Sequence, residues 1–146
     1  MKRLLSMTLA LSMLVVLVLS LASCSVYGKI QRNFTNAGYE VVNTKDAEGN
    51  DALSFVTDLG ESGEAACTVH ILKKSLVEYA IILEFEADRA AQEKLDELLT
   101  DTDIGNLSSV DDKSKLIRGN CLLIPVSLNL LNLKASVNEM VELFNK

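Results

Sequence analysis

The chain has 146 residues and carries 14 lysines and arginines against 20 aspartates and glutamates, a formal net charge of −6. This length suits one domain with a substantial hydrophobic core. An acidic chain without a basic stripe repels phosphate groups, so we expect no nucleic-acid partner. With one histidine, three cysteines and no Cys-x-x-Cys pair, the sequence predicts no Cys/His metal site, and we expect no cofactor.

The first 24 residues have the arrangement of an export signal. Lys2 and Arg3 form a positively charged start, and residues 4–19 follow without any charge. A basic start, an apolar stretch and small residues before the cleavage point are typical of a secretory signal peptide. The segment ends with four residues that match the lipobox of bacterial lipoproteins: Leu21, Ala22, Ser23 and Cys24.

The chain therefore resembles a bacterial lipoprotein precursor. The resemblance implies cleavage between Ser23 and Cys24, a lipid on the Cys24 sulfur, and a mature domain over residues 24–146. It also implies a protein on the outer face of the cell membrane, or at the outer membrane if the bacterium has one. Two alternatives remain: residues 4–22 could form an uncleaved spanning helix of ~20 residues, or ordinary cleavage could leave Cys24 unmodified.

Removing residues 1–23 also changes the charge. Without Lys2 and Arg3 the chain keeps 12 basic and 20 acidic residues, a net charge of −8. Because anionic lipids repel such a body, we expect the lipid and not a protein face to hold the domain at the membrane.

The mature chain begins with a helix and a strand. Apolar residues at helical spacing predict a helix over 25–37, which Gly38 ends in the manner of a C-cap glycine. Residues 39–42 read as a strand and 44–50 as a polar turn. Asn50 or Asp51 can then cap a second helix that runs to Leu59.

Two strands and a third helix follow. Residues 65–73 and 77–86 alternate between apolar and polar side chains, which predicts a hairpin with its tip at Lys74 and Ser75. Residues 88–100 have the apolar stripe of a helix. Residues 101–115 are polar and are expected to form an exposed connection.

The chain ends with a strand and a helix. Residues 116–126 read as a strand, which Gly119 and Asn120 could divide into a tight hairpin. Pro125 indicates that the end of this strand lies at a sheet edge. Ser127 is expected to cap a last helix that runs to Phe144, with Leu130 among its inward residues.

This order of elements predicts an α+β fold. The middle elements match a ferredoxin-like βαββαβ sandwich, an antiparallel sheet with helices on one face, to which the first and last helices are added. In its strand order, 4-1-3-2, the strands of Cys67 and Cys121 would lie at opposite edges. Three strand spacings separate them by ~14 Å, whereas a disulfide needs Cα atoms within ~7 Å. We therefore expect both thiols to be free.

The pattern is also similar to small uncharacterised lipoproteins of Gram-positive-type bacteria. The similar segments are residues 36–41, a helix end followed by a strand, and residues 85–91, a strand end followed by an acidic helix. This resemblance implies a fold and no activity.

The candidate chemistries are weak. Cys67 and His70 would point to opposite faces of a strand, because three residues separate them. Residues 60–64 approach the G-x-S-x-G pattern but follow a helix and not a strand. Glutamates 78, 84 and 86 are expected to line a solvated sheet face. The sequence therefore predicts no catalytic residue.

An acidic loop and an apolar surface remain as alternatives. Asp101, Asp103, Asp111 and Asp112 lie in loop 101–115, which could bind Ca²⁺ or serve an enzyme, although it departs from the EF-hand pattern. A candidate interaction surface contains Leu72 and Ile82, on the far side of the sheet, and Leu128 and Leu131, on the last helix. A terminal helix would cover part of that sheet face, or else a protein partner or a second copy would.

Together these features predict a membrane-anchored, non-enzymatic binding or envelope-accessory domain. The alternatives are an enzyme or Ca²⁺-binding domain that uses loop 101–115, and a structural subunit of an envelope complex.

Overall fold

The structure, a computed structural model, describes residues 25–43, 67–100 and 104–146. These residues form an α+β domain with a five-stranded antiparallel open sheet, three α-helices and two short 3₁₀ turns. In chain order the elements are α2 (Val26–Asn36), β1 (Glu40–Val42), β2 (Cys67–Ser75), β3 (Glu78–Phe85), α4 (Asp88–Leu98), η3 (Leu107–Ser109), η4 (Lys113–Leu116), β4 (Ile117–Arg118), β5 (Cys121–Ser127) and α5 (Leu133–Asn145). The export segment, the turn expected at 44–50 and the helix expected up to Leu59 lie outside the described residues.

The α+β class is confirmed, but the ferredoxin-like strand order is wrong. The strands are ordered β1-β2-β3-β5-β4, so β1 lies at an edge and not between β3 and the final long strand. Direct antiparallel pairing runs from Glu78 opposite Ser127 to Glu84 opposite Cys121. This pairing leaves no room for another strand between β3 and β5.

The lengths of the strands explain this order. A buried strand must hydrogen-bond its backbone groups on both sides. β1 has only three residues, so it could satisfy less than half of the eight-residue β3, whereas the seven residues of β5 match nearly all of it. The hairpin at Gly119 (φ +57°) and Asn120 turns the chain back after β4, so that β5 runs antiparallel to β3. This hairpin confirms that the predicted final strand is divided.

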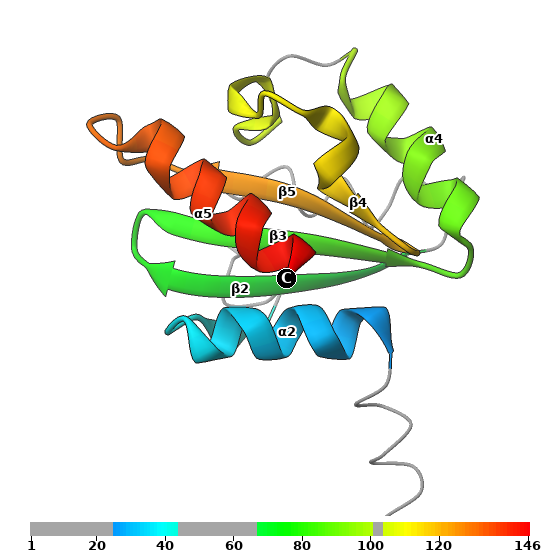
Figure 1. The fold of residues 1–146 in the computed structure, drawn as a ribbon, viewed down its shortest axis with the longest axis horizontal. Coiled ribbons are helices and arrows are strands. Elements are labelled where there is room, and N and C mark those ends of the chain that lie inside the picture. The colour runs from blue at the N-terminus through cyan, green and yellow to red at the C-terminus, as the bar shows by residue number, and fades with distance from the viewer. Residues whose placement is uncertain (1–24, 44–66, 101–103) are drawn as a thin grey trace, which may run out of the picture.

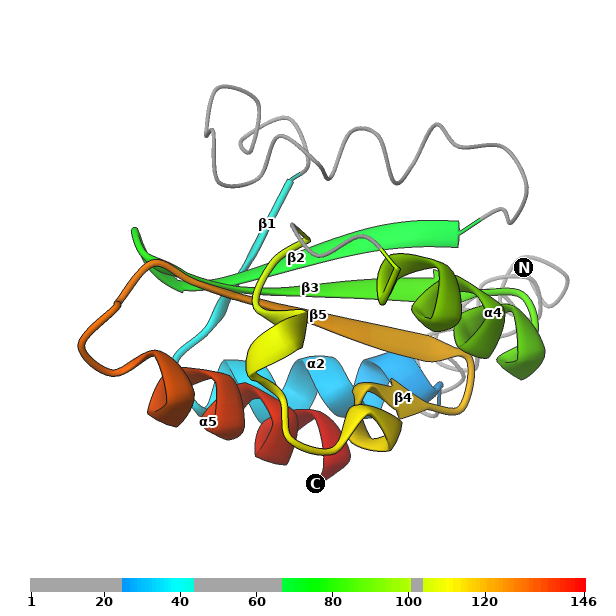
Figure 2. The same cartoon turned by 90° about the horizontal axis from the view of Figure 1, so that it is seen from above.

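Both faces of the sheet are covered. Helices α2 and α5 lie side by side on one face, and α4 lies on the other face over the ends of β3 and β5 (Figures 1 and 2). The expectation that a terminal helix covers the far side of the sheet is confirmed, since both terminal helices do so. Of the two core helices in the ferredoxin-like prediction only α4 is described, and it lies on the face opposite the terminal helices.

The ends of α2 agree with the sequence. The Ser25 hydroxyl accepts a hydrogen bond from the Gly28 N–H at 2.9 Å, which satisfies one free donor of the first turn. Gly38 follows the helix with φ +90°, a conformation that glycine adopts without a Cβ penalty. α2 buries Ile30 and Phe34 completely against the sheet and α5.

The segment 104–116 is not the exposed connection that its composition indicates. Leu107, Val110 and Leu116 are buried. The Asn106 N–H donates to the Pro125 carbonyl at 2.8 Å, and the Asn106 side chain accepts from the Ser127 N–H. The segment therefore closes the edge of β5 beyond β4, where Pro125, which lacks an N–H, is tolerated.

The last helix begins five residues later than expected, with Asn132 and not Ser127 at its N-cap. Ser127 pairs with Glu78 as the final residue of β5, and its hydroxyl accepts from the Asn129 N–H at 3.3 Å. It therefore caps a turn and not a helix, and α5 starts at Leu133. Leu130, expected to be inward, is 84% exposed in the intervening loop.

Candidate functional site

The lipidation site predicted by the sequence borders the described domain. Ser23 and Cys24 lie outside the described residues, and Ser25 already belongs to the cap of α2. A single residue thus separates the predicted anchor from the first turn of a helix. No helix within the described residues is long and apolar enough to span a membrane.

The structure divides the four residues of the candidate interaction surface into two buried and two exposed leucine or isoleucine side chains. Leu72 and Ile82 have no exposed surface, because α2 and α5 cover that face of the sheet. Neither residue can contact a partner in the folded domain. Leu128 and Leu131 are 50% and 95% exposed, but they lie in the loop before α5 and not on the helix.

These two leucines belong to a larger exposed group, which we name the leucine patch. The Leu128 N–H donates to the Val77 carbonyl at 2.8 Å, so the loop before α5 lies against the tip of the β2–β3 hairpin. Both segments expose large aliphatic side chains, and together they form the patch: Leu76, Val77, Leu128, Leu130 and Leu131. The sequence patterns did not predict that Leu76 would be exposed. They predicted that Val77 and Leu130 would point into the core.

The leucine patch lies at the end of the domain opposite the start of α2 (Figure 1). β3 runs between the two ends, with Glu78 near the patch and Glu84 near Tyr27 of α2. At about 3.3 Å per residue, this strand spans about 25 Å. A group bound to Cys24 and a partner bound to the leucine patch would therefore be well separated.

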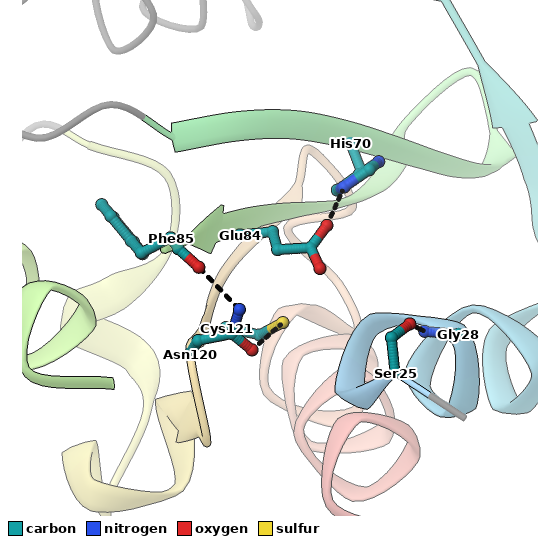
Figure 3. A network of polar contacts seen from close by, with 7 residues as sticks. All are labelled: Ser25, Gly28, His70, Glu84, Phe85, Asn120 and Cys121. Atoms are coloured by element: carbon teal, nitrogen blue, oxygen red, sulfur yellow. Dashed lines mark hydrogen bonds and ion pairs between the residues drawn. The ribbon is translucent and has the colours of Figure 1, made fainter. Parts of the chain in front are cut away.

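A polar contact between His70 and Glu84 on the sheet (Figure 3) adjoins Tyr27 in the first turn of α2. The Tyr27 ring stacks on His70 with centroids 3.5 Å apart, and His70 Nε2 lies 2.9 Å from Glu84 Oε2. Burial, with the negative charge of Glu84 adding to it, raises the pKa of Tyr27 to about 12. Both His70 and Glu84 are largely covered, so the cluster reads as a docking contact between α2 and the sheet.

The two cysteines differ in their relation to this cluster, because Cys121 lies opposite Glu84 and Cys67 does not. Cys67 pairs across the sheet with Phe85 and Cys121 with Glu84, so their side chains lie on opposite faces. Both thiols are free, and the two strands are separated by one strand, not at opposite edges as the sequence indicated. Burial is the main cause that raises the pKa of Cys121 to about 12, which disfavours the nucleophilic thiolate.

The glutamates of β3 do not line a solvated face. Glu84 bonds His70, and Glu78 accepts a hydrogen bond from the Ser136 hydroxyl of α5. Each carboxylate is thus half-buried beneath a terminal helix and has a specific partner. Glu86, outside the strand, is exposed.

The acidic loop gives little support to an ion site. Asp101 and Asp103 lie outside the described residues, Asp111 pairs with Lys134 at 3.2 Å, and Asp112 caps η4 through Ser114. Hydrogen bonds from Ser114 are the first cause that lowers the pKa of Asp112, the opposite of what a general acid needs. Within the described residues no three metal-ligating side chains come together.

Comparison of the chain with protein-family models, with curated proteins and with solved structures returned no match. The function must therefore be argued from the lipobox and from the geometry of the described domain.

Proposed function

We propose that this chain is an exported lipoprotein, held at the membrane by lipid on Cys24, whose mature domain is a non-enzymatic binding or envelope-accessory domain. The lipobox supports the anchor. The leucine patch supports the binding role and is the observation that carries it. Leu76, Leu130 and Leu131 are 77%, 84% and 95% exposed, an arrangement that costs solubility unless something covers it.

The partner of the leucine patch is a protein in this proposal. The patch lies at the end of the domain opposite the start of α2, so an anchor at Cys24 leaves it free to meet another envelope protein or a second copy of the chain. Aliphatic side chains on two adjoining loops are suited to the apolar centre of a protein interface.

Crosslinking in living cells tests the binding role. The full-length chain should give a crosslinked product of defined mass, and the double variant Leu130→Ser/Leu131→Ser should lose that product while keeping the same thermal stability. Leu99→Ser, which alters a leucine that is 38% exposed at the end of α4, is the matched control and should keep the product. A product that persists in the double variant, or no product from the unaltered chain, would overturn the binding role.

Membrane fractionation tests the anchor separately. The unaltered protein should remain with membranes in high salt, because acyl chains hold it there. The variant Cys24→Ser should not be lipidated, so the anchor would be lost. Equal membrane retention of the two at high salt would contradict the proposal.

A further inference from the structure

The exposed side of α2 differs in charge from the other two α-helices of the domain. α2 contains two basic residues, Lys29 and Arg32, and no acidic residue. By the same count α4 has a net charge of −2 and α5 of −1. α2 is thus the one positively charged α-helix among those described, in a chain whose residues 24–146 carry −8.

Lys29 and Arg32 share the outer side of the helix. Ile30 and Phe34 point into the core, and Lys29 and Arg32, three positions apart, are exposed. Neither basic side chain forms an ion pair with a described residue, whereas the lysines of α4 and α5 are paired with Glu97 and Asp111. Two positive charges are therefore available to an outside partner.

The anchor brings this side of α2 close to lipid headgroups. Ser25 caps the helix directly after Cys24, so no flexible tether separates a lipid on Cys24 from the first turn. At 1.5 Å per residue, Lys29 and Arg32 lie roughly 6 Å and 10 Å along the helix from Ser25. The first distance is within the Debye length of about 8 Å at physiological ionic strength, and the second is close to it.

We propose that the outer side of α2, through Lys29 and Arg32, rests on the anionic headgroups of the bilayer and sets the orientation of the domain. The inference rests on the proposed lipid anchor. Anionic lipid attracts these two charges and repels the acidic remainder, so α2 faces the bilayer and the leucine patch stays off it. This differs from the expectation from net charge alone, under which no protein face would approach the membrane.

Lysine acetylation on vesicles tests the orientation. The native protein is purified from membranes, and its intact mass establishes whether Cys24 carries lipid. It is then placed in vesicles of phosphatidylcholine, with or without phosphatidylglycerol. Lys29 should be acetylated about fivefold more slowly with phosphatidylglycerol, relative to Lys134 at the far end of the domain, and high salt should abolish the difference.

Matched variants separate charge attraction from simple proximity. Arg32→Gln should reduce the protection of Lys29. Arg89→Gln removes another exposed arginine from α4, on the other face of the sheet, and should leave the protection unchanged. Lipid on Cys24 with equal Lys29 reactivity in both vesicles, or equal effects of the two variants, would overturn the orientation alone. A bare Cys24 thiol would overturn the anchor and the orientation together.

Discussion

At the scale of single residues, the contact between His70 and Glu84 is a polar contact that a helix covers. The two side chains are 20% and 27% exposed, because Tyr27 of α2 covers the imidazole. The pair on α4, Arg89 with Glu93, is 89% and 64% exposed and lies in water. We therefore expect the contact between His70 and Glu84 to contribute more to the free energy of unfolding than the pair on α4 does.

Replacement of His70 by alanine should lower the free energy of unfolding by about 1–2 kcal/mol, because it leaves the Glu84 carboxylate and the Tyr27 ring without their partner. Arg89→Ala should cost less than about 0.5 kcal/mol. Urea denaturation of both variants measures the difference. Equal losses would show that the cluster under α2 does not stabilise the fold.

Alkaline pH should destabilise the domain. Burial raises the pKa of Tyr27 from 10.0, and that of Cys121 from 9.0, in each case to about 12. The folded state thus holds these protons to higher pH than the unfolded state does. The stabilisation is complete below the unfolded pKa values and is lost as the pH rises through the folded ones, between about pH 9 and 12.

The variant Tyr27→Phe should weaken this pH dependence. It removes one of the groups that lose stability on deprotonation, so the fall in unfolding free energy above pH 10 should be smaller by about 1 kcal/mol, after allowance for its partial exposure. Urea denaturation over a series of alkaline pH values measures it. An unchanged slope would mean that the Tyr27 hydroxyl titrates alike in both states.

At the scale of elements, the docking of segment 104–116 on β5 depends on one glycine. Gly105 has φ +54°, and a Cβ there would lie 2.8 Å from Ile124 Cγ2 and from the Pro125 carbonyl oxygen. Gly38 has φ +90° but nothing within 4 Å of a Cβ. The two positions separate the cost of steric collision from that of backbone strain.

Gly105→Ala should therefore lower the free energy of unfolding by about 2–3 kcal/mol, because strain and collision add. Gly38→Ala should lower it by about 1 kcal/mol, the cost of strain alone. Thermal or urea denaturation of the two variants provides the comparison. Similar losses would imply that the 104–116 segment moves away from β5 without difficulty.

The individual helices and turns could be predicted from the sequence, but the order of the strands in the sheet could not. The helices near 25–37 and 88–100, and the turn at Gly119, depend on side-chain periodicity and on a positive φ, which are local properties. The choice of neighbour for β3 depends on the relative lengths of β1 and β5, which are more than 75 residues apart in the chain. No local pattern records that competition, so the ferredoxin-like order was wrong.

At the scale of the whole molecule, the packing of the helices and the position of the anchor decide which surfaces a partner or a membrane can reach. Alternation placed Leu72 and Ile82 on one sheet face, but only the packing of α2 and α5 decides that this face is closed. Leu128 and Leu131 were predicted to be exposed on the last helix. They are exposed, but they lie in the loop before it. The leucine patch and the basic side of α2 arise from residues that no motif connects.

The central claim is that a lipid on Cys24 holds this acidic domain at a membrane, and intact-mass measurement of the native protein tests it most directly. The account predicts a chain that begins at Cys24 and carries the added mass of a diacylglyceryl group, with or without a third acyl chain. A chain that retains residues 1–23, or one that begins at Cys24 with an unmodified thiol, would contradict it.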